Sequence, residues 1–580
     1  MSVSPPATRQ TDVIEEARIL PAAAMPAWRQ RVAASGVPTW LLVLVAVVPF
    51  LVLFLDLGTP SLWDPDEGLP AEVAREMLIS GDWLSPKLNF VSYREKPPAY
   101  FWILAAAMWV FGERNEAAIR LPSVLLALGV IWWIFFWGWR HLRPIAGAFA
   151  ALVLTTTAGY VAVSRLGIDD AASGLLLTIS TLAMSEPLLS RRARFPWVAY
   201  VALAAAALSL GACAVLLPIF VAAAFVAVVR EPGRLLDLRP LRGVGIVAIL
   251  IMPVLLLAAA RDPAYVSGLF KEHSQIAFFD PHFHEEHSYS LPSFLAITAI
   301  LMLPWGIFLP WTLRDALRSG GERSPEARIF LLAWLAGDVV FFVVTGANLV
   351  TYVILALVPL TALTARALAR FLRAPRPQSL LTDPILLGSA ILFVVVLAAP
   401  FLTRRVLLNE FPTYADKVVF SFLLIPFAAA GIGAVARRNR LGALGAIVAC
   451  SVVTLMSLYR FGSATVSAYN SMELPADLIA VRLPPEAPIV SYGTTSHTLA
   501  FYSGRPVTLV VNMRDARELL NGKRPIALLT KERFLPDVRA VLDRSLYVWW
   551  VGDSKKMLLA NIPPPPGVDR RILLPALPAK

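Results

Sequence analysis

The chain has 580 residues, of which 57% are hydrophobic and only 16% are charged, and its mean hydropathy is +0.65. This composition excludes an ordinary soluble enzyme and predicts a polytopic α-helical membrane protein. The net charge of +12 does not indicate a nucleic-acid partner, because the basic residues lie between apolar segments, as membrane topology alone requires. The two cysteines, Cys213 and Cys450, lie within apolar runs and give no indication of a disulfide.

The apolar runs define the expected membrane domain. Residues 1–39 are polar and lack the cleavage site of a signal peptide, so we expect a cytoplasmic N-terminal tail. A transmembrane domain at 40–460 follows, because thirteen apolar runs approach the roughly 20 residues that cross a ~30 Å hydrocarbon layer. The expected spans are 39–57, 121–139, 145–163, 170–188, 197–210, 213–229, 243–260, 292–313, 329–345, 350–369, 380–400, 417–436 and 441–459.

The apolar run at 99–111 is short for a span, and counting it would reverse the side of everything after it. If it does not cross, the arginine-rich loops all face the cytoplasm, as the positive-inside rule requires. We therefore expect a re-entrant or interfacial helix on the outer side. The loops at 58–120 and 261–291 and the C-terminal region then face outward, which in a bacterium is the periplasm.

A charged segment at 61–98 is the expected location of the chemistry. Its acidic and basic side chains need water or a wet cavity, because unpaired charges are costly in hydrocarbon. It contains the acidic pair Asp66-Glu67 and the cluster Tyr93-Arg94-Glu95-Lys96-Pro97-Pro98.

Structural explanations exist for the same residues. Asp64 could cap the helix that follows it, with Pro65 at the first helical position and Glu67 at the third. Asp169 and Asp170 could likewise cap the apolar run that they precede. Lys96 could be an interfacial lysine that snorkels toward water. Spacing alone favours these structural interpretations.

The 261–291 loop contains several potential metal ligands. These are His273, His282, His284, His287, Glu272, Glu285 and Glu286. Histidine and carboxylate groups can bind a divalent metal, but no HExxH spacing is present, and a solvated loop on lipid headgroups explains the residues equally well. We expect no required cofactor, with a divalent metal near Glu95 and His273 as the alternative.

Residues 461–580 differ in character from the preceding chain. The β-rich runs PIVSYG, PVTLVV, PIALLT and SLYVWWVG alternate with helical patterns such as RDARELLNG, which predicts a small extracytoplasmic α/β domain. It has no GxGxxG, Walker A or Ser-His-Asp pattern. We expect an accessory or substrate-shaping domain.

The motifs taken together resemble a known family. Their order is DPDE, a helix, GDWLSPKLNF, YREKPPAYFW, FG, an Arg-Leu-Pro before a span, and RLGIDDA. This order resembles the GT-C class of polyprenyl-phosphate-dependent glycosyltransferases, in the branch with the lipid A aminoarabinose transferase and the bacterial relatives of protein O-mannosyltransferases. The resemblance covers about residues 57–352. It implies an inverting enzyme of the bacterial inner membrane that moves a sugar from a polyprenyl-phosphate donor to a lipid A-like lipid, a glycan or a protein.

The resemblance also implies roles for individual residues. Asp66 matches the proposed catalytic carboxylate, with Glu67 beside it, and Asp170 fits the second acidic position better than Asp169. The other implied site residues are Tyr93, Glu95, Lys96, Glu272, His273 and Tyr352, of which Tyr93, Lys96 and Tyr352 would bind the donor phosphate.

The implied mechanism agrees with elementary electrostatics. Transfer leaves a dianionic lipid phosphate, so the site needs a fixed cation and hydrogen-bond donors where that charge develops. Lys96 fits this task. Asp66 would take a proton from a hydroxyl acceptor, or would position a phosphate acceptor, which needs no base.

Three family cations are missing from this sequence. Leu69, Ile276 and Asn348 stand where the family has arginine, arginine and lysine. These departures affect the acceptor or the sugar more than the reaction class. A transporter or flippase is the competing hypothesis, but the sequence has no inverted repeat and no mid-span charge relay apart from Asp338. An inactive scaffold is the remaining alternative.

Overall fold

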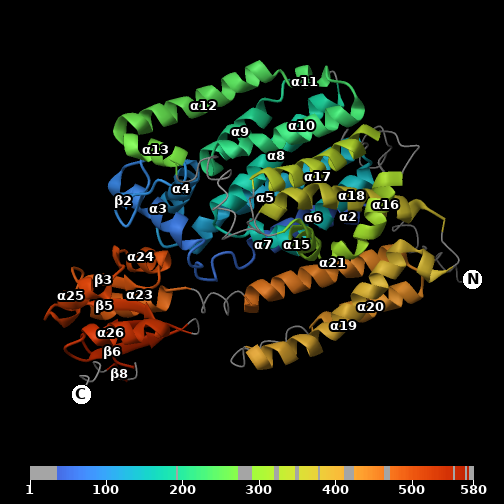
Figure 1. Cartoon of the computed structure of the whole chain (residues 1–580). Helices are drawn as coiled ribbons and strands as arrows, with labels where there is room; N and C mark the ends of the chain where they lie inside the picture. The colour runs from blue at the N-terminus through green and yellow to red at the C-terminus, as the bar shows by residue number, and fades with distance from the viewer. Residues whose placement is uncertain are drawn as a thin grey trace, which may run out of the picture.

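The computed structural model describes residues 36–190, 194–271, 290–318, 325–345, 352–375, 379–410, 423–462, 471–552, 555–567 and 571–573. The expected N-terminal tail lies almost entirely outside these ranges, and so do Asn348 and all the candidate metal ligands at 272–287. Figure 1 shows a large body of helices, with an α/β domain at one end of it.

The helical body contains helices in every one of the thirteen expected apolar runs. They are α2 (Thr39–Phe54), α5 (Glu116–His141), α6 (Pro144–Thr155), α7 (Ala158–Ser164), α8 (Asp169–Leu189), α9 (Trp197–Leu210), α10 (Leu216–Val229), α12 (Pro240–Arg261), α15 (Leu291–Leu301), α16 (Leu309–Arg318), α17 (Pro325–Thr345), α18 (Val353–Arg373), α19 (Pro384–Glu410), α20 (Ile425–Ala436) and α21 (Arg440–Ser457).

In the described part of the chain, fewer helices than the thirteen expected spans have the length and hydropathy of a membrane crossing. Among the described residues, five helices are long and apolar enough to cross a membrane. Two bent pairs bring the number to seven if each pair is one span: α6 with α7, bent by 63°, and the segments 291–301 and 305–318, bent by 115°. Several other apolar helices are shorter. The count of thirteen spans stays a prediction.

Burial separates a central helix from a peripheral one. Most of α18 is buried, and α18 packs against α6, α8 and α17. In contrast, α12 exposes large apolar side chains such as Leu241 and Ile249, which suits a helix that faces lipid. Small residues allow close helix packing, since a Cβ on Gly138 of α5 would lie 2.8 Å from the Cα of Gly147 in α6.

The outer loop at 58–120 folds into short elements. They are α3 (Gly68–Ser80), β1 (Lys87–Leu88), β2 (Val91–Ser92) and α4 (Ala99–Phe111). Helix α4 packs against α3 and α5. With 13 residues it is about 20 Å long, which is shorter than the hydrocarbon layer. Its length agrees with the re-entrant or interfacial helix expected there.

The C-terminal domain contains a six-stranded sheet of order β4-β3-β5-β7-β6-β8. The four expected strands are present as β3 (Ile489–Tyr492), β4 (Val507–Val510), β5 (Ala527–Lys531) and β6 (Leu546–Val551). Two further strands, β7 (Lys556–Ala560) and β8 (Arg571–Leu573), were not predicted from the sequence. Strand β3 runs parallel to β4 and β5, and the other pairs are antiparallel. The main helices are α23 (Glu473–Arg482), α24 (His497–Ser503), α25 (Arg517–Asn521) and α26 (Leu535–Val541). The expected combination of a helical region and a sheet-containing C-terminal region is confirmed.

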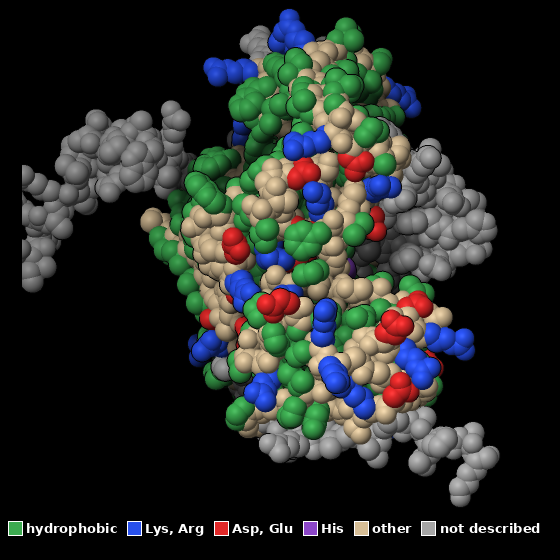
Figure 2. All heavy atoms as spheres, turned by 90° about the vertical axis from the view of Figure 1, so that its left-hand side faces the viewer, with side chains coloured by type: hydrophobic (Ala, Val, Ile, Leu, Met, Phe, Trp, Pro, Cys, Tyr) green, Lys and Arg blue, Asp and Glu red, His purple; other side chains and the backbone are tan. Residues whose placement is uncertain are grey.

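The outer loop and the C-terminal domain share one hydrophobic core. Met77 of α3 and Leu104 of α4 belong to the same buried cluster as Ile479 of α23 and Leu499 of α24. Helix α24 packs directly on α3. Figure 2 shows this end of the molecule, where charged side chains of both signs gather over the lower part and hydrophobic atoms dominate the upper part. The shared core fixes the C-terminal domain against the loop that carries the candidate site.

Candidate active site

Lys96 lies where three distant segments meet. Its ammonium group pairs with the carboxylate of Asp169 and lies 3.4 Å from Oδ1 of Asp170. The hydroxyl of Tyr352, just before α18, donates to the same Asp170 oxygen at 3.3 Å. The hydroxyl of Tyr265 donates to the backbone carbonyl of Lys96 at 3.0 Å. The structure therefore brings together three of the expected residues, and it adds Asp169 and Tyr265.

The start of α8 explains why two carboxylates are available to one lysine. Ile168 occupies the N-cap position without a side-chain cap, and Asp169 and Asp170 lie in the first turn. Carboxylates are favoured there by the helix dipole. Both side chains interact with Lys96, so the expectation that they cap the helix is wrong, and Lys96 does not snorkel along an interface.

The ion pairs keep Lys96 charged. Burial lowers the pKa of Lys96, but the adjacent Asp169 and Asp170 carboxylates outweigh this effect and raise the pKa above its ordinary value. The side chain keeps 21% of its surface exposed. A positive charge is thus held in a fixed position that a ligand can still reach.

Asp66 lies in the loop before α3 and is exposed. Among the described residues its carboxylate has no hydrogen-bond partner. Partial burial raises its pKa, as do the charges of Asp170, Glu67 and Asp64, whereas Lys96 lowers it. Asp170 and Lys96 are thus among the charges that act on Asp66. Its carboxylate is exposed and available to a ligand.

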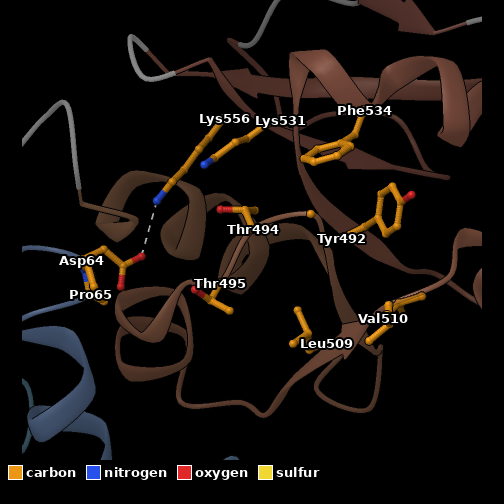
Figure 3. Close-up of a pocket in the computed structure, with 12 residues that line it drawn as sticks. Asp64, Pro65, Tyr492, Thr494, Thr495, Leu509, Val510, Lys531, Phe534 and Lys556 are labelled. Atoms are coloured by element: carbon orange, nitrogen blue, oxygen red, sulfur yellow. Dashed lines mark ion pairs between the residues drawn. The ribbon is translucent and has the colours of Figure 1, made fainter. Parts of the chain in front are cut away.

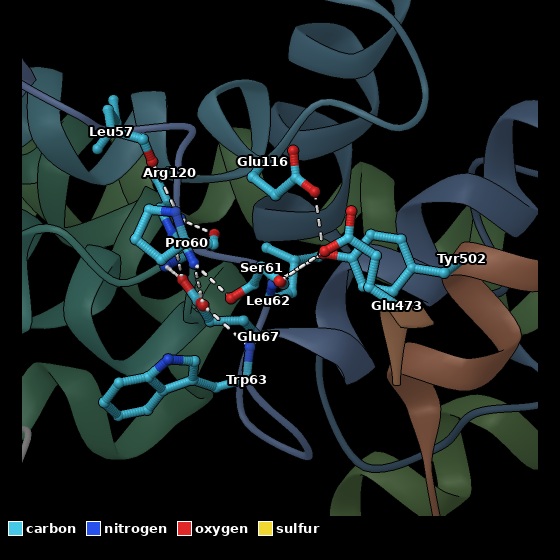
Figure 4. Close-up of polar contacts among 11 residues, drawn as sticks. Leu57, Pro60, Ser61, Leu62, Trp63, Glu67, Glu116, Arg120, Glu473 and Tyr502 are labelled. Carbon is cyan, nitrogen blue, oxygen red and sulfur yellow. Dashed lines mark hydrogen bonds and ion pairs between the residues drawn. The ribbon is translucent and has the colours of Figure 1, made fainter. Parts of the chain in front are cut away.

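Glu67 is in a different environment from its neighbour, as Figure 4 shows. It is fully buried, and its two oxygens accept from Nε and Nη2 of Arg120 at 2.8 and 2.7 Å. The backbone N–H of Gly167 donates to the same carboxylate at 2.9 Å. All of these contacts are with groups of the protein itself. The geometry favours a positioning role for Glu67 over the catalytic role that was expected.

Arg120 holds the chain that leads into the acidic loop. Its Nη1 donates to the carbonyls of Leu57 and Pro60 at 3.0 and 2.7 Å. The Ser61 hydroxyl then donates to Glu473 at 2.6 Å, and the Leu62 N–H donates to the Tyr502 hydroxyl at 2.8 Å. The C-terminal domain thus anchors this loop (Figure 4). Arg120 belongs to the Arg-Leu-Pro motif, but nothing local in the sequence points to Glu473 or Tyr502.

Asp64 joins the loop to the C-terminal domain. Its Oδ1 accepts from the backbone N–H groups of His497 and Thr498, at 2.9 and 3.1 Å, where α24 begins. Lys556 lies 3.6 Å from its other oxygen. Helix α3 starts only at Gly68, and Glu67 makes no side-chain cap there. The expectation that Asp64 caps its own helix is wrong, since it caps a helix of another domain.

The chain is similar to known proteins in both sequence and fold. The family of dolichyl-phosphate-mannose-protein mannosyltransferases matches residues 95–257. An undecaprenyl phosphate-alpha-4-amino-4-deoxy-L-arabinose arabinosyl transferase from Pseudomonas paraeruginosa is 31% identical over 409 residues, which cover 68% of this chain and 71% of that enzyme. The enzyme of the same name from Serratia proteamaculans is 27% identical over 460 residues, 76% of this chain and 79% of that enzyme.

The chain belongs to this family of arabinosyl transferases. It is accordingly a glycosyltransferase. The crystal structure of ArnT from Cupriavidus metallidurans bound to undecaprenyl phosphate has the same fold, with a TM-score of 0.76 and 22% identity, and covers 91% of this chain and 99% of that one. The apo structure of the same protein gives a TM-score of 0.74.

In this member of the arabinosyl transferase family, the other expected residues lie outside the Lys96 cluster. Tyr93 is buried, and its hydroxyl donates to Glu95 at 3.1 Å rather than to a member of the Lys96 cluster. Burial is the main cause that raises the Tyr93 pKa. Leu69, in place of the family arginine, packs partly buried against the core shared with the C-terminal domain. Its environment therefore suits an apolar side chain.

The expected metal ligands Glu272 and His273 lie outside the described residues. Ile276 and Asn348, two of the positions without the family cation, also lie outside them. Within the described ranges, no group of three or more His, Cys, Asp or Glu side chains is placed to hold a metal ion. A divalent metal near Glu95 and His273 stays a prediction.

Proposed function

We propose that this glycosyltransferase moves an aminoarabinose-type sugar from undecaprenyl phosphate to a lipid A-like glycolipid. The donor and the sugar are those in the names of its relatives. The observation that carries the proposal is the cluster of Lys96 with Asp169, Asp170 and Tyr352. The exposed carboxylate of Asp66 adds to it. The cluster supplies one fixed cation, and Asp66 supplies one available carboxylate, to a reacting pair of substrates.

Lys96 would stabilise the leaving group. As the bond between the sugar anomeric carbon and the phosphate oxygen breaks, that oxygen keeps the electron pair and the lipid phosphate becomes dianionic. A preorganised ammonium group is worth most where such charge develops. Asp169 and Asp170 would hold the Lys96 ammonium in place before the donor arrives, so that little reorganisation is needed during the reaction.

Asp66 would act on the acceptor. Attack by an acceptor oxygen forms the new bond at the anomeric carbon from the opposite side, so a single displacement inverts the configuration. A hydroxyl acceptor must lose its proton, and Asp66 can take it. A phosphate acceptor is already ionised, and Asp66 would then orient it. The geometry allows either role, since the Asp66 carboxylate has no partner among the described residues.

The site would face the periplasm, on the side of the membrane that carries the C-terminal domain. This orientation follows from the positive-inside distribution of arginine-rich loops. Envelope glycans and proteins on the same side are the alternative acceptors. The lipid acceptor takes precedence because the motif order resembles that of the lipid A aminoarabinose transferase, and arabinosyl transferase relatives are similar over more than two thirds of this chain.

Reconstitution with defined substrates tests the proposal. Purified full-length protein in detergent is given the undecaprenyl-phosphate aminoarabinose donor and lipid A, and the products are read by mass spectrometry. We expect the acceptor to gain the mass of one aminoarabinose residue, in an amount equal to the undecaprenyl phosphate released. Asp66→Asn protein should give no product. Transfer to a glycan or protein acceptor but not to lipid A would reject the lipid proposal.

A further inference from the structure

A pocket of about 830 Å³ opens between the C-terminal domain and the loop before α3 (Figure 3). Its walls come from the carboxyl ends of β3, β4 and β5, from the start of β7, and from Asp64 and Pro65 of the outer loop. The mechanism described above does not use it. Pro65 directly precedes Asp66, so the pocket borders the loop that carries the carboxylate proposed to act on the acceptor.

The sheet topology favours a ligand at this position. Strand β3 pairs in parallel with β4 on one side and with β5 on the other. After β3 the chain forms β4 on one side of β3, and it then crosses to form β5 on the other side. The direction of the connections therefore changes at β3. In open α/β sheets, ligands bind outside the carboxyl ends of the strands at such a switch point. The pocket occupies this crevice.

The charges in the pocket are unbalanced. Lys531 and Lys556 are direct cross-strand partners on β5 and β7, and both line the pocket. Like charges directly opposite each other destabilise a sheet. Asp64 lies 3.6 Å from Lys556, whereas Lys531 forms no ion pair with any described residue. Two lysines and one aspartate give the lining a net charge of +1. A bound anion would relieve the repulsion.

The other residues that line the pocket suit a sugar that carries the anionic group. Thr494 and Thr495 follow β3 and offer hydroxyl groups beside the lysines. Phe534 offers an aromatic face in the same pocket, with Leu509 and Val510 on the opposite wall (Figure 3). Ligand sites commonly combine a largely apolar lining with a few placed polar groups and a charge. This combination fits a phosphorylated sugar better than a free inorganic anion.

We infer that this pocket binds a phosphate group on the sugar portion of the acceptor, with Lys531 and Lys556 as its cations. The inference rests on the proposed function, because that function supplies an acceptor glycolipid with phosphate groups. An acceptor held between these lysines extends past Pro65 toward Asp66. The C-terminal domain would thereby select the acceptor, while the outer loop performs the transfer.

Binding without the donor tests the pocket separately from the reaction. Full-length protein in detergent is titrated with lipid A and, in a second arm, with lipid A from which the phosphates have been removed. We expect Lys531→Ala to weaken binding of phosphorylated lipid A about tenfold, the usual size of one charged hydrogen bond. Lys531→Arg should restore most of the affinity. Binding of the dephosphorylated lipid should be weak and the same in all variants.

Lys523→Ala is the matched control, because Lys523 is exposed just before the amino end of β5, whereas Lys531 is at its carboxyl end. The control should bind phosphorylated lipid A like the unchanged protein. Equal loss in both variants, equal binding of both lipids, or full competition by millimolar inorganic phosphate would overturn the inference.

Transfer kinetics distinguish this inference from the proposed function. In an active enzyme, Lys531→Ala should raise the acceptor KM about tenfold and leave the donor KM unchanged. If the unchanged protein binds phosphorylated lipid A through Lys531 but transfers no sugar, the proposed function is wrong and the pocket stands. If it transfers sugar and Lys531→Ala has an unchanged acceptor KM, the pocket is wrong and the function stands.

Discussion

The Glu67 carboxylate and the Arg120 guanidinium form a two-point ion pair, with Nε to Oε1 at 2.8 Å and Nη2 to Oε2 at 2.7 Å. Both side chains are buried. Removal of one partner from such a pair leaves an uncompensated buried charge and typically costs about 3–5 kcal/mol. We expect Glu67→Ala to lower the free energy of unfolding in detergent by about 3–5 kcal/mol.

A double-variant cycle checks that the loss comes from this pair. Arg120→Ala should cost a similar amount, and Glu67→Ala with Arg120→Ala should cost clearly less than the sum, because neither charge is then left alone. A Glu67→Gln protein that keeps its stability but transfers no sugar would instead return Glu67 to a catalytic role.

Lys96 gives a second prediction. Lys96→Ala should reduce transfer by about 10²–10³, the usual effect of losing one preorganised electrostatic group. It should also reduce stability, because Asp169 and Asp170 lose their counter-charge. Lys96→Arg should keep the stability and lose activity, because guanidinium and ammonium groups differ in shape. Lys87→Ala, in the same outer loop, is the control and should behave like the unchanged protein.

The comparison of Lys96→Ala with Lys96→Arg separates a local electrostatic effect from unfolding. Activity is measured as initial rate with saturating donor, and folding as the melting temperature of the purified protein. Normal turnover in Lys96→Ala would remove this lysine from the site.

Asp66 gives a third prediction, in which pH supplies the test. Burial and neighbouring carboxylates raise its pKa, so it takes up a proton at a higher pH than an ordinary aspartate does. If the ionised form is needed, transfer should fall as the pH is lowered through this raised pKa. Asp66→Asn should be stable and inactive, because the amide keeps the shape but cannot accept a proton.

The alternative is that Asp66 is only a carboxylate near a helix terminus, whose interaction with the helix dipole contributes about 0.3–1 kcal/mol. Replacement of such a group by Asn would have little effect on activity. A stable Asp66→Asn protein with near-normal turnover would support that alternative. Asp170 would then become the candidate catalytic carboxylate.

Gly68 gives a fourth prediction, for the interface between the domains. A Cβ at this position would lie 2.6 Å from Cγ2 of Thr498 and 2.8 Å from its backbone nitrogen. Gly68→Ala should therefore separate α3 from α24 and lower both stability and transfer, since overpacking typically costs about 1–3 kcal/mol. Gly129→Ala in α5, where the added Cβ meets nothing within 4 Å, is the control and should be neutral. Equal behaviour of the two variants would contradict a tight interface.

The topology gives a fifth prediction. Reporter fusions at Gly112 and at Gly504 should both report the outer face, because the arginine-rich loops place the cytoplasm on the other side. A cytoplasmic signal from either fusion would mean that α4 crosses the membrane.

Local sequence patterns predicted most elements of the fold. Apolar runs predicted the helices, because burial of backbone polar groups in lipid leaves a helix as the stable local structure. Alternating β-branched runs predicted β3, β4, β5 and β6. The pattern was insufficient for β7, because the run at 556–560 begins with a lysine and contains no β-branched or aromatic residue.

The candidate residues were also recognised in the sequence, but their partners were not. Motif order pointed to Asp66, Lys96 and Asp170, and the family resemblance is confirmed. It did not distinguish exposed Asp66 from fully buried Glu67, although they are neighbours. Spacing alone favoured Asp64 as the cap of its own helix, whereas its partners are more than 400 residues away in the chain.

The sequence by itself determined the chemistry that this protein has available and the segments that carry it, because residue type and local hydrophobic pattern are properties of short stretches of chain. Only the tertiary structure decided which carboxylate is free, which one is neutralised by Arg120, and which two hold Lys96. It also placed Lys531 of the C-terminal domain in a pocket beside the acidic loop. Charge pairing and burial depend on distances between side chains remote in sequence, and the packing of the helices sets those distances, as α3 against α24 does between the outer loop and the C-terminal domain.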